Sequence, residues 1–274
     1  MPSGLQGAAV AVVCRDTRGV ALDAAQRLSH FPASPLVCLS WFQGMEAGLV
    51  TPDGDDRSTW TPFGAQVVLS GSQSAPRVSW APTTGRGGMV CFAPDAAQAL
   101  FGLDLPGLHD RFVDARSLLG TEWQGLLDAL LAADGNEATL RALERHLLPR
   151  WRVVQGPASV RDLGRQWVQR LACRAHAWRR THSSRQVERR VKAFSGRSLR
   201  DWQQLVRTEA VFFAARDRVG ADDDLDWAVL AQDGGFADQA HLIRASRRIT
   251  GFTPGEFARR FLEDESFWLY RLWV

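Results

Sequence analysis

Two segments in the C-terminal half carry arginine, glutamine and histidine side chains at helical spacing, and these side chains can hydrogen-bond to nucleic acid. One segment is "DQAHLIRASRRITG", residues 238–251. At about 100° of rotation per residue, one face and its flanks collect Gln239, Ala240, His241, Arg244 and Arg247. In a DNA major groove, arginine can bond bidentately to guanine and glutamine to adenine. The segment therefore predicts a helix with a face suited to duplex DNA.

The apolar side of the same helix lies opposite this polar face. Its members are Leu242, Ala245, Ser246 and Ile249. The second segment, "SSRQVERRVKAFSG" at residues 183–196, divides in the same way, with Val187, Val191 and Phe194 on the apolar side. Its polar side holds Arg185, Glu188, Arg189 and Lys192. A single helix of this type is more often a solvated face, but two such helices favour a contact surface for DNA.

The surrounding elements predict two helix-turn-helix units. Each segment begins at a polar or small cap and ends at glycine, and a preceding helical stretch stops at Arg180 or Gly234. The stretch between the units, "LRDWQQLVRTEAVFFAAR", has one apolar stripe: Leu199, Trp202, Leu205, Val206 and Phe213, with Glu209 as the polar exception. We expect this stretch to be a buried connecting helix.

The motif "LDWAVLAQDGGFADQAHLIRASRRITGFTPGEFARRF" resembles the C-terminal signature of AraC/XylS-type transcriptional regulators. The resemblance covers about 100 residues and implies two recognition helices in successive major grooves. Carried over by position, it implies that the base-reading residues are Arg185, Glu188, Arg189, Gln239, Ala240, His241 and Arg244. We add Lys192 and Arg247 to the expected DNA-binding set because they lie on the same polar faces.

Several positions depart from the family pattern. Thr181 replaces the turn glycine of the first unit, and His176 and Arg180 occupy scaffold positions that are usually apolar. In the second recognition helix, Ser246 replaces an aromatic residue beside an apolar Ile243. An aromatic tail follows, with Phe267, Trp268, Leu269 and Trp273. We expect the tail either to fill the space beside Ser246 or to cover a partner.

The first hundred residues predict a β-rich domain. Five short apolar runs, "AAVAVVC", "PLVCLSWF", "AQVVLSG", "RVSWAP" and "GGMVCFAP", are separated by turn sequences. From Asp95 onward the spacing becomes helical. The Gly-Pro pair in residues 153–159 predicts a boundary between a regulatory domain at 1–155 and a DNA-binding domain at 156–274. The expected fold class is α+β, with a β-rich domain followed by an all-α double helix-turn-helix domain.

The N-terminal half resembles the cupin-like sensing domains that precede this DNA-binding module in some family members. That resemblance implies a ligand pocket or a dimer surface. Metal-binding cupins use an H-x-H pair, whereas His30, His109 and His146 are isolated here, so we expect no metal and no cofactor. Three strand tryptophans are candidates to line a ligand pocket: Trp41, Trp60 and Trp80.

The charge distribution favours an anionic partner for the second half. Residues 1–155 hold 12 basic and 15 acidic residues, whereas 156–274 hold 21 basic and 15 acidic residues. Such a field attracts phosphate backbones. The four cysteines are scattered, which excludes a zinc cluster and a methyl-accepting repair enzyme of the kind fused to such modules. No apolar run reaches the roughly 18 residues of a membrane span.

These observations predict a cytoplasmic, non-enzymatic, sequence-specific transcription regulator that binds double-stranded DNA. Its N-terminal domain is expected to sense a signal or mediate dimerisation. A small-molecule effector, RNA polymerase and a second copy of the chain are further candidate partners, and activation and repression fit equally. The alternative is a protein-interaction module, derived from an AraC-type regulator, with reduced DNA binding.

Overall fold

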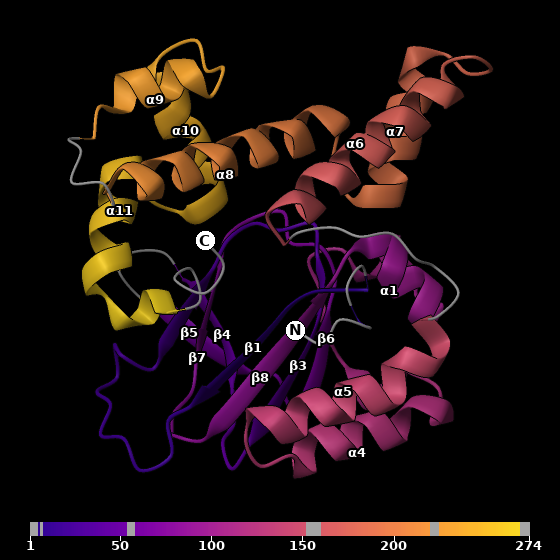
Figure 1. Cartoon of the computed structure of the whole chain (residues 1–274), viewed down its shortest axis with the longest axis vertical. Helices are drawn as coiled ribbons and strands as arrows, with labels where there is room; N and C mark the ends of the chain where they lie inside the picture. Colours follow the sequence, from indigo (N-terminus) through magenta and orange to yellow (C-terminus); the bar gives the residue numbers. More distant parts are fainter. Residues whose placement is uncertain (1–4, 6–7, 54–57, 152–159, 220–224, 269–274) are drawn as a thin grey trace.

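The protein has a β-rich first half and a helical second half, which confirms the predicted α+β class. The computed structural model describes residues 5, 8–53, 58–151, 160–219 and 225–268. In Figure 1 the strands, in indigo and purple, form the lower part, and the helices of the second half, in orange and yellow, lie above them. The predicted boundary at residues 153–159 lies outside the described residues.

The strands form two antiparallel sheets. One has the order β1-β8-β3-β6-β9 and the other the order β2-β7-β4-β5. Their bounds are β1 Ala9–Asp16, β2 Leu28–Phe31, β3 Val37–Gln43, β4 Gly48–Pro52, β5 Ser58–Pro62, β6 Val67–Ser70, β7 Arg77–Trp80, β8 Arg86–Phe92 and β9 Phe112–Asp114.

All five apolar runs of the sequence are strands, namely β1, β3, β6, β7 and β8. The strands β2, β4, β5 and β9 were not predicted. Strand β5, "STWTP", is exposed along most of its length and so lacks an apolar alternation, and β9 is three residues long. These strands form because they hydrogen-bond to neighbouring strands, not because their own residues alternate between apolar and polar.

The five-stranded sheet buries one face against helices. Leu39 and Trp41 on β3 and Val90 and Phe92 on β8 belong to one core cluster with residues of α1, α4 and α5. Trp41 fits because Gly88 faces it, where a Cβ atom would lie 2.1 Å from the indole Cζ2. The helices of this half are α1 Pro94–Phe101, α2 Leu105–Leu108, α3 Ala115–Leu118, the 3-10 turn η2 Thr121–Trp123, α4 Gln124–Ala132 and α5 Asn136–Trp151.

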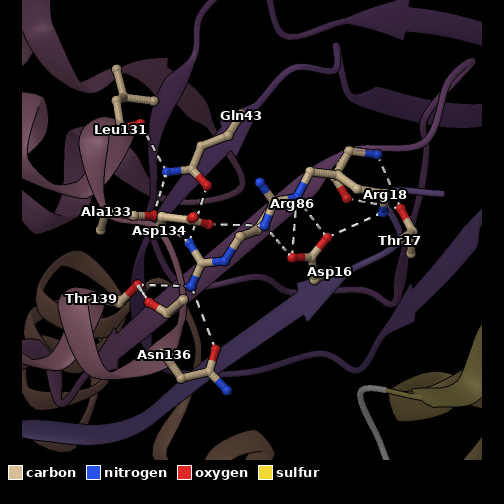
Figure 2. Close-up of polar contacts among 12 residues, drawn as sticks. Asp16, Thr17, Arg18, Gln43, Arg86, Leu131, Ala133, Asp134, Asn136 and Thr139 are labelled. Carbon is tan, nitrogen blue, oxygen red and sulfur yellow. Dashed lines mark hydrogen bonds and ion pairs between the residues drawn. The ribbon is translucent and has the colours of Figure 1, made fainter.

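A buried arginine fastens this sheet to α4 and α5, as Figure 2 shows. Arg86 is 1% exposed, and its Nη1 donates to Gln43 Oε1 and to the Ala133 carbonyl, each at 3.0 Å. Its Nη2 donates to Thr139 Oγ1 at 2.9 Å. Ala133 is the C-cap of α4, so the cation also faces the negative end of that helix dipole. These contacts compensate the cost of burying the charge.

The second half contains six helices and one 3-10 turn among its described residues. They are α6 Val160–Trp178, α7 Ser184–Ser195, α8 Leu199–Val219, α9 Trp227–Asp233, α10 Gln239–Thr250, α11 Pro254–Glu263 and η3 Glu265–Phe267. The pairs α6–α7 and α9–α10 lie towards opposite ends of α8 in Figure 1. The predicted two-unit layout and its connecting helix are confirmed.

The connecting helix α8 is buried on one side. Trp202, Leu205, Thr208, Val211, Phe212 and Ala215 are buried. The prediction named Phe213 where Phe212 is buried. Phe212 follows Leu205 by seven residues, which is two helical turns, and so lies on the same buried side. Phe213 is one residue further round the helix and is half-buried.

The departures in the first unit leave its core intact. Helix α6 buries Trp167, Val168, Leu171 and Ala175, while His176 and Arg180 are exposed. Trp167 and Trp202 meet edge to face, with ring centroids 5.4 Å apart. The two polar side chains therefore lie in solvent and place no charge in the core.

The buried Ser246 of the second unit is satisfied by a hydrogen bond. Its side chain is 0% exposed, and its Oγ donates to the Phe252 carbonyl at 2.7 Å. The aromatic tail packs in a neighbouring cluster: Phe267 is 0% exposed together with buried Phe212 and Phe257. Leu269 and Trp273 lie outside the described residues. None of the described helices is long and apolar enough to cross a membrane.

Candidate nucleic-acid interface

Helix α10 presents the polar face that the sequence predicts. Asp238 caps its first turn, with Oδ1 accepting from the His241 N–H at 2.6 Å, and Gly251 ends it with φ 88°. The predicted apolar side is buried: Leu242, Ala245, Ser246 and Ile249. Gln239, Ala240, Arg244 and Arg247 are exposed. Sequence and structure therefore agree on which face is available to a partner.

Helix α7 has the same arrangement. Ser183 and Gln186 form a capping box at its start, and Gly196 ends it with φ 80°. Val187 and Val191 are buried and Phe194 is half-buried against the same core. All four predicted contact residues are exposed: Arg185, Glu188, Arg189 and Lys192.

Two of these exposed α7 residues pair with each other. Lys192 Nζ lies 3.2 Å from Glu188 Oε1 in an i,i+4 ion pair. Arg185 and Arg189 form no ion pair with any described residue. Arg190, also exposed on α7, lies over the Trp178 ring at 5.8 Å. The net positive charge of α7 therefore comes from Arg185, Arg189 and Arg190.

His241 is only partly available. Its ring meets Phe236 edge to face at 5.2 Å, and its Nε2 lies 3.3 Å from Gln204 Nε2 on α8. Gln204 Oε1 also accepts from Arg248 Nη2 at 2.8 Å. His241 is thus held at the edge of the polar face, with one ring nitrogen engaged by the scaffold.

The sequence analysis missed the contribution of α8 to this surface. A shallow depression is shared by α8, the turn before α10, and α10 itself, and is lined by Arg200, Asp201, Gln204, Ala237, Asp238, His241, Arg244 and Arg248. Arg200, Gln204 and Arg207 recur at spacings of four and three residues, which puts them on one side of a helix. This spacing is visible in the sequence. The sequence prediction for this helix used only its apolar stripe and so treated the helix as a buried connector.

The C-terminal ends of α7 and α10 contact the first half of the chain. The Ala33 N–H donates to the Ile249 carbonyl at 2.8 Å, at the end of α10. At the end of α7, a Cβ on Gly196 would lie 2.3 Å from His109 Nδ1. The N-terminal turns, which carry Arg185 and Gln239, remain exposed. In helix-turn-helix proteins the N-terminal residues of the recognition helix contact base edges.

The two sheets enclose a cavity of about 160 Å³. Its lining is largely apolar and includes Phe31, Leu36, Leu49, Phe63, Val68 and Phe112. Three arginines also line it: Arg15, Arg27 and Arg77. Arg27 Nε is buried without a hydrogen-bond partner, whereas Arg77 is paired with Asp110 at 3.2 Å. The cavity can therefore take a compact, mainly apolar ligand with an electron-rich group.

The three tryptophans proposed for a pocket do not line this cavity. Trp41 is 0% exposed in the core on the other face of β3. Trp60 and Trp80 pack edge to face with ring centroids 5.7 Å apart, and Trp60 Nε1 donates to the Trp80 carbonyl. Strand alternation turns Trp41 away from the cavity, and mutual packing occupies the other two.

A different tryptophan, from the tail, is part of the cavity wall. Trp268 Nε1 donates to Ser29 Oγ at 2.9 Å, and the Arg15 guanidinium lies 5.2 Å from the indole centroid. Arg15 Nη2 also lies 3.0 Å from Glu265 Oε1. The wall of the cavity is therefore built by both halves of the chain.

Burial changes the ionisation of two further groups, His30 on β2 and Glu209 on α8. His30 on β2 packs on Phe267 with ring centroids 4.9 Å apart, and burial lowers the pKa of its imidazole. Burial raises the pKa of the Glu209 carboxyl on α8 to about 7. Both groups favour their neutral forms in the folded chain.

Comparison with protein-family models and with curated proteins finds no match to this chain. Among solved structures, apo ToxT carrying K231A, from Vibrio cholerae strain SCE256, is similar over 90% of this chain and 95% of that chain. Its sequence identity is 9% and its TM-score 0.42. Wild-type ToxT from the same strain, bound to an unsaturated fatty acid, covers 92% and 95%, with 9% identity and a TM-score of 0.35.

Proposed function

We propose that the protein is a sequence-specific regulator of transcription that binds double-stranded DNA through α7 and α10. The observation that carries the proposal is the pair of capped helices on one connecting helix, each with a buried apolar side and an exposed cationic side. The motif resemblance to AraC/XylS-type regulators covers this same region. The proposed regulator acts by binding, with no catalytic step.

The exposed side chains divide into two proposed roles. Arg185 and Arg189 on α7, and Gln239 and Arg244 on α10, lie within the first two turns and are proposed to meet base edges. Arg247 lies farther along α10 and is proposed to meet a phosphate. Glu188, Lys192, Ala240 and His241 complete the proposed interface.

The β domain is proposed to bind an effector in its cavity. Trp268 is a wall of that cavity and directly follows η3, whose Phe267 packs on Phe257 of α11. A ligand that moves Trp268 would therefore also disturb the packing beneath the second helix-turn-helix unit. RNA polymerase and a second copy of the chain are further proposed partners.

Selection of bound duplexes from a random pool, with the purified full chain, tests the proposal. The expected result is an enriched sequence with two blocks about 10 base pairs apart, which is the spacing of recognition helices on one face of DNA. Enrichment of no sequence, together with the same weak affinity for every duplex, would instead support the protein-interaction module.

A further inference from the structure

Four sulfur-containing side chains line the cavity between the sheets. The chain has four cysteines and three methionines. Those that line the cavity are Cys38, Met45, Met89 and Cys91. The other cysteines lie elsewhere: Cys14 hydrogen-bonds to Thr139 on α5, and Cys173 is exposed on α6. The sulfur atoms of the described chain are thus concentrated on one internal surface.

Two of these side chains are in direct contact. Cys38 and Cys91 are directly opposite in the antiparallel β3–β8 pair, and their Sγ atoms are 3.4 Å apart. Both are free thiols. Because directly opposite residues share a face of the sheet, both thiols lie on the cavity side.

The methionines extend this sulfur surface along β8. Met89 precedes Cys91 by two residues and so lies on the same face of the strand. Met45 covers the next position on that face, because its Cε would lie 2.9 Å from a Cβ on Gly87. Thioethers therefore continue from the thiol pair along one strand.

We infer that this surface is a binding site for a soft monovalent d10 cation, with Cu(I) as the physiological candidate. Soft thiolate and thioether ligands select Cu(I). On binding, the two S–H bonds of Cys38 and Cys91 break, two S–Cu bonds form, and both protons leave to solvent without any change of oxidation state. The described residues contain no group of three or more His, Cys, Asp or Glu side chains that could hold a metal. The site would instead combine two thiolates with a methionine thioether.

The charge of the cavity suits this complex. Two thiolates and one monovalent cation have a net charge of −1. Arg15, Arg27 and Arg77 line the same cavity. The Arg27 guanidinium makes no ion pair with a described carboxylate, so its charge is available to a bound anion.

This inference names the effector of the regulator proposed above, and only its regulatory consequence rests on that proposed function. The site itself is tested without DNA. The parent protein for the test is the full chain carrying Cys14→Ser and Cys173→Ser, which leaves the cavity thiols as the only cysteines. Under anaerobic conditions it is titrated with Cu(I) against a chromophoric Cu(I) chelator, and native mass spectrometry counts the ions bound.

We expect one Cu(I) per chain. Cys38→Ala should weaken binding by more than the roughly 10- to 100-fold that loss of a supporting contact costs at a metal site. Met89→Leu, which conserves volume, should weaken it less. Cys38 is half-buried, so its alanine variant is the main test, and circular dichroism confirms that each variant folds.

Unchanged Cu(I) affinity in Cys38→Ala would overturn the site. The site would also be overturned if the protein binds no Cu(I) while a mild oxidant converts Cys38 and Cys91 to a disulfide. That result would make the two thiols a redox pair. If Cu(I) binds as expected but leaves the affinity for the selected duplex unchanged, the effector role is contradicted while the site stands. If Cu(I) binds and no duplex is selected at all, the proposed DNA-binding function fails instead.

Discussion

Trp268 Nε1 donates to Ser29 Oγ across 2.9 Å and joins residues 239 positions apart in the chain. The bond ties the end of the helical half to strand β2 of the first half. Arg15 reinforces it by stacking over the same indole and by pairing with Glu265. The tail is therefore a structural connection between the cavity of the first half and the proposed DNA-binding half.

Replacing Trp268 with alanine should loosen that connection. Ser29→Ala should cost about 1 kcal/mol by removing one hydrogen bond, and Trp268→Ala should cost more because the half-buried ring is also lost. Limited proteolysis and thermal unfolding of the full chain provide the measurement. Trp268→Phe is the matched control, since it keeps an aromatic ring at the site while removing the N–H donor and part of the indole. Equal melting temperatures for the alanine variant and the parent would show that the Trp268 contact does not stabilise the association of the two halves.

Phe267→Ala should destabilise the second helix-turn-helix unit. Phe267 is 0% exposed and touches Phe252 and Phe257 with ring centroids 5.1 and 5.8 Å apart. Truncating a buried phenylalanine costs about 3 to 5 kcal/mol. Denaturant unfolding measures the change in free energy, and Leu262→Ala, at a side chain 60% exposed, should shift it by less than about 0.5 kcal/mol. Removal of the tail after Phe261 is expected to lower the free energy of unfolding by at least as much as Phe267→Ala. If Phe267→Ala and Leu262→Ala have similar effects, the tail does not stabilise this unit.

Glu209→Gln should remove a pH dependence of stability. The folded pKa is about 7, against an ordinary value of 4.5. Because the pKa is raised in the folded state, the neutral carboxyl of Glu209 favours folding. This contribution to stability is fully present below pH 4.5 and is lost as pH rises through 7. Glu209 keeps some exposure, so we expect Gln to add about 1 to 2 kcal/mol at pH 8 and little at pH 5. Unfolding curves at the two pH values decide, and a gain of equal size at both would exclude ionisation as the cause.

Arginine substitutions should separate base reading from phosphate contact. Arg189→Ala and Arg244→Ala should each relax preference at different positions of the selected site, at a cost of about 1 to 3 kcal/mol. Arg247→Ala should weaken all sequences similarly and lower the salt slope by about one unit. Selected-sequence profiles of the three variants are compared with the parent. Unaltered base preference in Arg244→Ala would mean that α10 is not a reading helix.

The sequence predicted elements whose pattern is local. The caps Ser183 and Asp238 and the end glycines Gly196 and Gly251 set the limits of α7 and α10 through contacts within a few residues. The strand β5 escaped prediction because its pairing with β4, rather than its own apolar content, makes it a strand. The lining of the cavity was predicted wrongly, because which strand face points inward depends on the partner sheet. Trp41 and Cys38 are three residues apart on β3 but lie on opposite faces of it.

The affinity of the full chain for its selected duplex, measured across a range of salt concentrations, tests the central claim most directly. Two cationic recognition helices predict specific binding over a scrambled duplex and a log–log salt slope of close to −0.9 for each phosphate neutralised. Substituting Arg244 with alanine should reduce the preference for the selected duplex while retaining the greater part of the slope. Equal affinity for selected and scrambled duplexes, or an affinity that does not change with salt, would contradict the account.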